Sequence, residues 1–110
     1  MFEEITQISE FDKVLKESPA ILAYFFSDDC NVCKNLKPKV EELIVGNFPQ
    51  IRGVYINLNS AFDLSARYSV FVAPTIVIFL DSRELFRRSR AFGIHELNEK
   101  IKRPYQLLFS

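Results

Sequence analysis

The chain has 110 residues, 48% apolar and 25% charged, which predicts one soluble globular domain over residues 1–110. Fourteen Lys and Arg balance fourteen Asp and Glu, so charge gives no reason to expect nucleic acid or an anionic membrane as a partner. The longest apolar run, residues 70–80, is interrupted by Pro74 and is too short to span a bilayer. The acidic start, without a charged-then-apolar leader, favours a cytoplasmic protein.

The first third of the chain predicts a helix followed by a buried strand. Ser9, with Asp12 three residues later, is typical of a helix N-cap with an acidic first turn. Pro19 should end this helix, because the residue before a proline disfavours α geometry. Residues 20–26 form an apolar run without polar alternation, as in a strand covered by helices on both faces.

The middle of the chain predicts a long helix and a second strand. Apolar residues recur at helical spacing over residues 30–44, and Pro38 should kink this helix. Gly46 and Asn47 close it. Alternating apolar residues within 51–58 predict a strand parallel to 20–26.

The last third predicts a short helix over 61–68, a buried strand over 75–80 and a hairpin return strand after the turn at 81–82. Gly93 precedes a final amphipathic helix, which Pro104 should stop. The complete order predicts an α/β fold with a mixed sheet between layers of helices.

The chemistry-bearing feature is the pair Cys30 and Cys33, placed where a buried strand leads into a helix. A helix N-terminus offers free N–H groups and a positive dipole end, which stabilise a thiolate. Lys34 adds positive charge, whereas Asp28 and Asp29 oppose a further negative charge. These three residues are therefore predicted to modulate the pKa of Cys30, which should be lowered by the helix start.

Several motifs in the right order resemble the thioredoxin superfamily over nearly the whole chain. They are Cys30-x-x-Cys33-Lys34, Pro38 in the active-site helix, Ala66-x-Tyr68-x-Val70, Ala73-Pro74-Thr75 and Gly93. The resemblance implies a thioredoxin fold, with a central mixed sheet of four to five strands flanked by four helices. It also implies that Pro74 follows a cis peptide bond.

The resemblance further implies a thiol–disulfide oxidoreductase acting on protein disulfides, with Cys30 as nucleophile and Cys33 as resolving cysteine. Its substrate groove would be formed by Val72, Ala73, Pro74, Phe92 and Gly93. No cofactor is expected beyond the redox-active disulfide. Because the sequence shows no site for NADPH or flavin, electrons should come from an upstream reductase or a small thiol.

The sequence departs from the family pattern around the dithiol. The family has a tryptophan directly before its first active-site cysteine. This chain has no tryptophan, and Asp29 stands at that position, before Cys30. Tyr24 aligns with the family's buried acid, Tyr55 with its lysine partner, and Asn59 with a third acidic position. Joint replacement of the acid and the lysine avoids an uncompensated buried charge. It leaves a tyrosine pair with hydrogen-bonding hydroxyls, and predicts slower exchange.

These departures keep other functions open. One alternative is a non-catalytic adaptor with weak redox activity. Another is a dimer bridged by a metal held by four thiolates, although no metal is predicted within one chain. The apolar tail 105–109 should fold back onto the sheet or form a homodimer contact. The arginines of the hairpin are interpreted as a solvated face.

Overall fold

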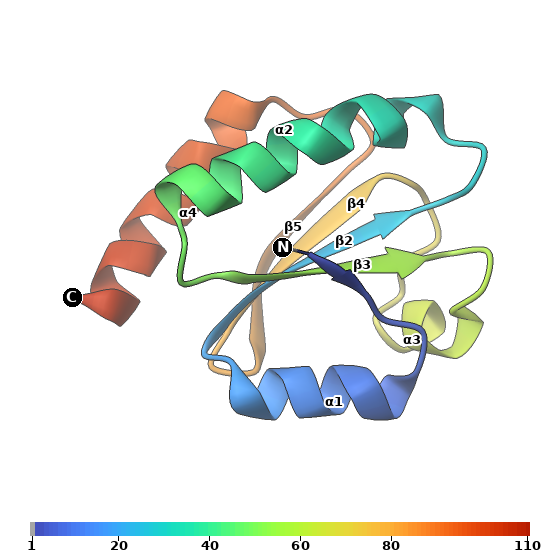
Figure 1. Ribbon diagram of the computed structural model, residues 1–110, viewed down its shortest axis with the longest axis horizontal. Coiled ribbons are helices and arrows are strands. Elements are labelled where there is room, and N and C mark those ends of the chain that lie inside the picture. Colours follow the sequence, from blue (N-terminus) through green and yellow to red (C-terminus); the bar gives the residue numbers. More distant parts are fainter. Residues whose placement is uncertain (1) are drawn as a thin grey trace.

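The computed structural model describes residues 2–110 and forms a five-stranded sheet between two pairs of helices (Figure 1). The strands lie in the order β1-β3-β2-β4-β5. β1 and β2 pair with β3 in parallel, whereas β4 pairs with β2 and β5 in antiparallel. The elements are β1 (Glu3–Glu4), α1 (Ile8–Glu17), β2 (Ala20–Phe26), α2 (Asn31–Asn47), β3 (Arg52–Asn57), α3 (Phe62–Arg67), β4 (Thr75–Leu80), β5 (Arg83–Ser89) and α4 (Ile94–Phe109). The predicted thioredoxin fold is confirmed.

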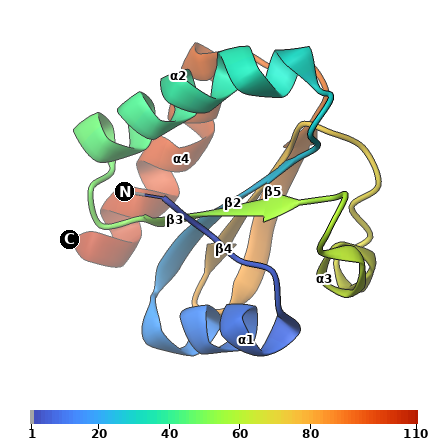
Figure 2. The same cartoon turned by 45° about the vertical axis from the view of Figure 1, so that its right-hand side comes forward.

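The helices lie in two layers, one on each face of the sheet (Figures 1 and 2): α2 and α4 cover one face, and α1 and α3 cover the other. Side chains of a strand alternate between faces. Leu22 and Tyr24 of β2 therefore join the core cluster under α2 and α4, while Ile21 and Phe25 join the cluster over α1 and α3. The unbroken apolar run of β2 reflects burial on both sides.

Helix α1 begins earlier than the sequence predicts. Its N-cap is Gln7, so the assignment of Ser9 as N-cap is wrong. The Glu10 carboxylate accepts hydrogen bonds from the backbone N–H of Gln7 at 3.0 Å and of Thr6 at 3.2 Å. The Glu10 side chain thus satisfies the N–H groups of Thr6 and Gln7, and the helix is capped two residues before Ser9.

Helix α4 continues through Pro104, so the prediction that Pro104 stops it is wrong. A proline inside a helix removes one backbone hydrogen bond. The packing of the next turn offsets that loss, because Tyr105, Leu108 and Phe109 lie against the core cluster under α2 and α4. The Tyr105 ring meets the ring of Phe48 edge-on, with centroids 5.0 Å apart. The tail therefore packs back onto the core as a helix.

The β4–β5 hairpin turns at Asp81 and Ser82, which both have positive φ angles of 50° and 68°. Two central residues with positive φ match the right-handed twist of the flanking strands. On β5, Arg87 pairs with Glu84 at 2.7 Å, and Arg88 pairs with Glu96 of α4 at 2.8 Å. Part of the basic cluster is thus neutralised within the chain.

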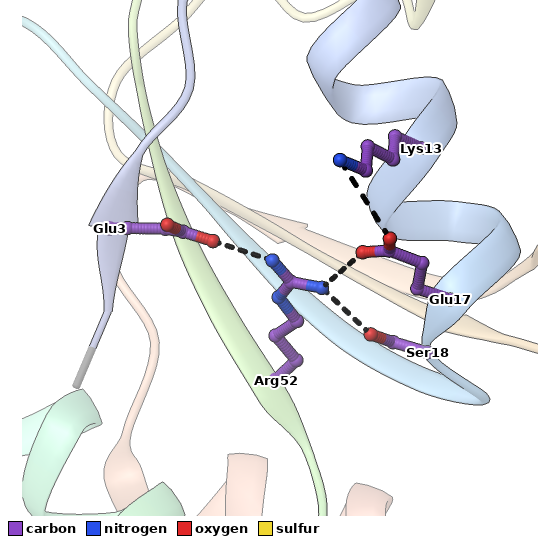
Figure 3. A network of polar contacts seen from close by, with 5 residues as sticks. All are labelled: Glu3, Lys13, Glu17, Ser18 and Arg52. Carbon is purple, nitrogen blue, oxygen red and sulfur yellow. Dashed lines mark hydrogen bonds and ion pairs between the residues drawn. The ribbon is translucent and has the colours of Figure 1, made fainter.

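Arg52 ties the edge of the sheet to α1 (Figure 3). Its guanidinium lies 2.7 Å from the carboxylate of Glu3 on β1 and 3.3 Å from that of Glu17 at the end of α1. It also donates to the Ser18 hydroxyl at 3.2 Å. This network holds the short strand β1 and the end of α1 against β3. Within residues 2–110, no helix is both long and apolar enough to cross a membrane.

Candidate active site

The loops that carry the predicted site lie together at the edge of the sheet where β2 and β5 end and β4 begins. Phe25 of β2 lies opposite Thr75 of β4, and Thr75 lies opposite Ser89 of β5. Because each pair is antiparallel, the loop after β2, the loop before β4 and the loop after β5 all leave the sheet at this edge. These loops contain the dithiol, Pro74 and Gly93.

Cys30 and Cys33 form a disulfide at the start of α2, with their Cα atoms 5.3 Å apart. Cys30 is the N-cap of the helix, and the backbone N–H of Cys33 donates to its Sγ at 3.1 Å. Cys30 is half-buried, whereas Cys33 is only 2% exposed. Cys30 is therefore the more accessible sulfur, and it is the one that meets a helix N–H donor.

The loop before β4 has a defined backbone, and the Ala73–Pro74 peptide bond is cis. The Thr75 hydroxyl donates to the Val72 carbonyl at 2.7 Å, and the Arg90 N–H donates to the Pro74 carbonyl at 2.7 Å. The first bond closes the turn before β4, and the second connects that turn to the loop after β5.

The other predicted groove residues lie at the same edge. Ala73, Phe92 and Cys30 all pack against the core cluster under α2 and α4. Gly93 is the N-cap of α4, and a Cβ placed there would meet no atom of residues 2–110 within 4 Å. The absence of a side chain at Gly93 therefore answers no packing need in the described part of the chain.

Tyr24 and Tyr55 occupy the core beside the dithiol. Tyr24 is fully buried, and its hydroxyl donates to the Cys33 carbonyl at 2.9 Å. The two rings meet edge-on with centroids 5.8 Å apart. The Tyr55 hydroxyl is buried without a hydrogen-bond partner among residues 2–110. The expected tyrosine pair is thus present, but only one of its hydroxyls makes the predicted hydrogen bond.

Burial keeps both tyrosines neutral. Desolvation raises the pKa of Tyr24 to about 12. Desolvation, followed by the nearby Glu41 carboxylate, raises the pKa of Tyr55 far above its ordinary value. Near neutral pH a protonated phenol is not a base. Tyr24 can therefore hold the Cys33 backbone, but it does not supply the carboxylate of the family pattern.

Asp28 is fixed beside the dithiol by two asparagines. Its carboxylate accepts from the Asn57 amide at 2.8 Å, and its backbone N–H donates to the Asn59 side-chain oxygen at 2.8 Å. The Asn59 backbone N–H in turn donates to the Asn57 side chain at 2.9 Å. Asn59, which replaces an acid of the family pattern, thus positions the loop that leads to Cys30.

A cavity of about 220 Å³ lies beside Cys33, lined by Phe26, Ser27, Asp28, Cys33, Lys34 and Lys37. The predicted pKa modulators Asp28, Asp29 and Lys34 are all exposed, but only Asp28 and Lys34 line this cavity. Sequence reasoning missed Lys37. Its position four residues after Cys33, on the same helix face, was the available signal.

Residues 2–110 contain no group of three or more His, Cys, Asp or Glu side chains arranged to hold a metal ion. The two sulfurs are bonded to each other in the structure. A bonded cysteine pair at a helix start supports thiol–disulfide exchange.

Comparisons with known proteins agree with this geometry. The family model described as Thioredoxin matches residues 3–103. The chain is 28% identical to the thioredoxin-like protein YdfQ of Bacillus subtilis, over 87% of this chain and 85% of that protein. It is also 28% identical to a thioredoxin of Chlamydia trachomatis, over 93% and 94% of the two chains.

Among solved structures, Fasciola hepatica thioredoxin superposes with a TM-score of 0.84 at 29% identity, over 93% of this chain and 98% of that one. The chain belongs to the thioredoxin family, and its Cys30–Cys33 pair makes it a thiol–disulfide oxidoreductase.

Proposed function

We propose that the chain reduces disulfides in protein substrates, with Cys30 as nucleophile and Cys33 as resolving cysteine. The observation that carries this assignment is the unequal setting of the two sulfurs. Cys30 is half-buried and its Sγ accepts the Cys33 N–H at 3.1 Å, whereas Cys33 is only 2% exposed. A donor on the sulfur and the positive end of the α2 dipole both favour a thiolate at Cys30.

The reaction proceeds in two exchanges. The Cys30 thiolate attacks one sulfur of the substrate disulfide, which forms a mixed disulfide and releases the other substrate sulfur as a thiolate. The Cys33 thiolate then attacks the Sγ of Cys30. The Cys30–Cys33 bond forms, and the second substrate sulfur leaves. Two electrons pass from the dithiol to the substrate, and both substrate thiolates take up protons.

The proton of Cys33 needs an acceptor before the second exchange. Tyr24 is excluded, because its phenol stays protonated near neutral pH. The Asp28 carboxylate lines the cavity beside Cys33 and is held by the Asn57 amide. We assign Asp28 as the acceptor that passes this proton on to solvent. Asp29 lies outside the cavity and has no such role.

The substrate would lie along the loop before Pro74. An extended peptide can pair with the backbone at Val72 and Ala73, as in strand addition. The open space at Gly93 leaves room for that peptide. Exposed apolar side chains would border it: Val32, in the first turn of α2, is 54% exposed, and Phe71, in the loop before β4, is 73% exposed.

The partners are the disulfide-containing proteins and an upstream reductase that regenerates the dithiol. A cytoplasmic location and a homodimer through the apolar tail stay predictions. Most of that tail is packed against the core, while Leu107 remains 68% exposed.

A disulfide-reduction assay with insulin and a small dithiol as electron source tests the proposal. The wild-type chain should accelerate reduction, and Cys30→Ser should abolish the acceleration. Cys33→Ser should accumulate a mixed disulfide at Cys30, detectable by mass under non-reducing conditions. Leu107→Ser, in the last turn of α4 and at the other end of that helix from Gly93, is a control that should keep full activity. A wild-type chain that binds partners but does not turn over would support an adaptor instead.

A further inference from the structure

The Lys37 ammonium occupies a defined place in the site that the proposed reaction does not use. Its Nζ lies 4.1 Å from the centroid of the Tyr55 ring and 5.7 Å from that of Phe26. An ammonium over an aromatic face is held by the ring's quadrupole. Lys37 is half-buried. Its long side chain is therefore directed along the core toward the sheet.

The same side chain lines the cavity beside Cys33. Lys37 and Cys33 are four residues apart on α2, which places them on one helix face. Tyr55, under the ammonium, packs edge-on against Tyr24, which bonds to the Cys33 carbonyl. Lys37 is thus fixed relative to Cys33 both along the helix and through the two tyrosines.

The charge of Lys37 is not neutralised by a direct ion pair among residues 2–110. The charged groups that face the cavity are Asp28, from the loop after β2, and Lys34 and Lys37, from α2. Tyr24 and Tyr55 face this region as neutral phenols, with Glu41 near the Tyr55 hydroxyl. Two ammonium groups thus line the cavity with one carboxylate, which is already bound to Asn57.

We propose that Lys37 is a positioning residue that stabilises the thiolate of Cys33 in the resolving step. The inference rests on the proposed function, because it concerns the attack of Cys33 on Cys30. Cys33 loses its proton through the cavity to Asp28 and solvent, and its sulfur then bonds to the Cys30 sulfur while the substrate thiolate leaves. The positive charge of Lys37 favours the charged form of the neighbouring sulfur.

The pKa of Cys33 measures this effect without any substrate. In the full chain carrying Cys30→Ser, Cys33 is the only cysteine, so the ¹³C chemical shift of labelled cysteine Cβ against pH reports it alone. Adding Lys37→Gln should raise the pKa of Cys33 by about one unit, which is a tenfold lower thiolate fraction at neutral pH. Lys37→Arg should restore the original value. Lys34→Gln is the matched control, and because Lys34 is more exposed it should give a clearly smaller shift.

A second measurement follows the resolving step itself. In the chain with both cysteines, Lys37→Gln should slow release of the substrate thiol from the mixed disulfide about tenfold at neutral pH. Raising the pH should recover the rate, because more Cys33 is then ionised. A merely structural change would slow release at every pH.

Three results would overturn the inference: an unchanged pKa of Cys33 in Lys37→Gln, an equal shift in Lys34→Gln, or a failure of Lys37→Arg to restore the value. The thermal midpoint of each variant identifies loss of folding, and Lys37→Met, which keeps most of the apolar stem, then replaces Lys37→Gln. Failure of the proposed function is a separate result, because the wild-type chain would not reduce insulin even if Lys37 controls the pKa of Cys33.

Discussion

The two faces of the sheet are built from the same strands but bury different kinds of side chain. The cluster over α1 and α3 has only aliphatic, alanine and phenylalanine side chains among its buried members. The cluster under α2 and α4 includes Cys33, Tyr24 and Tyr55, with Lys37 at its margin. One face therefore provides stability through apolar burial, and the other combines burial with groups that can bond, ionise or react.

Both faces contain a buried hydroxyl without a hydrogen-bond partner among residues 2–110, but only one of them carries buried tyrosine and cysteine side chains. The face under α2 and α4 contains a tyrosine hydroxyl without a hydrogen-bond partner, at Tyr55, and a tyrosine whose pKa burial raises to about 12, at Tyr24. A buried polar group without a partner opposes folding. The buried Ser65 hydroxyl of α3 has the same cost on the other face, so the faces differ in their ionisable and reactive groups rather than in hydrogen-bond satisfaction. Variants on the two faces should separate stability from chemistry.

The largest expected effect is on the apolar face. Phe11 of α1 is fully buried and packs edge-on against Phe79, with ring centroids 5.5 Å apart. Phe11→Ala should lower the free energy of unfolding by about 3–5 kcal/mol, because it removes apolar burial and leaves a cavity. Urea unfolding measures the loss. Phe62→Ala, at a side chain 69% exposed on α3, is the control and should change stability by about 0.5 kcal/mol at most.

The comparison also predicts that Phe11→Ala does not change the chemistry of the Cys30–Cys33 pair. In the folded fraction, the pKa of Cys30 and the rate of insulin reduction should match the wild type. A changed pKa would show that the two faces are coupled through the sheet.

On the reactive face, Tyr24 should make the protein sensitive to alkali. Its pKa is about 12 in the folded chain against 10.0 ordinarily, so the folded state holds the proton more tightly. The stability linked to this shift is fully present below pH 10 and is lost as the pH rises to about 12, a fall of about 3 kcal/mol in the free energy of unfolding. Urea midpoints measured across this pH range test the slope.

Tyr24→Phe is the matched variant for this slope. It should lose about 1 kcal/mol at neutral pH, because the hydrogen bond to the Cys33 carbonyl is gone. Above pH 10 it should decline less steeply than the wild type, although Tyr55, whose pKa is also raised, contributes in the same direction. An identical decline in both proteins would contradict the role of Tyr24.

Tyr55→Phe should have a smaller effect of opposite sign. The ring would keep its contacts with Tyr24 and the Lys37 ammonium, while the unpartnered hydroxyl would be removed. We expect no loss, or a gain of up to about 1 kcal/mol, in urea unfolding at neutral pH. A loss as large as that of Tyr24→Phe would show that the hydroxyl bonds to the nearby Glu41 carboxylate, which adds to the effect of burial in raising the pKa of Tyr55.

The sequence predicted most of the fold because its strongest signals are local. The runs at 20–26 and 75–80 match β2 and β4 residue for residue, since burial on both faces leaves a continuous apolar pattern. Two helix boundaries, the start of α1 and the end of α4, were predicted wrongly because other interactions outweighed the local sequence signal. Glu10 moved the cap of α1 to Gln7, and packing of the last helical turn outweighed Pro104.

The site was predicted less completely than the fold. The spacing of Cys30 and Cys33 and the loop at Pro74 identify the dithiol chemistry from sequence. Which of Asp28 and Asp29 reaches the cavity depends on the bond from Asn57, and the place of Lys37 depends on the Tyr55 ring below it. Such contacts join distant segments, and no local pattern specifies them.

The smallest expected effect lies at the edge of the sheet, outside both clusters. Arg52 is 36% exposed and bridges Glu3 and Glu17 (Figure 3). Exposed ion pairs contribute little and are screened by salt. Arg52→Gln should therefore cost about 0.5–1 kcal/mol in low salt and less at high ionic strength. Lys13→Gln is the control, because its ammonium is 74% exposed and 4.0 Å from Glu17. A loss for Arg52→Gln that does not change with salt would show that its packing on β3, rather than its charge, holds β1 and α1 in place.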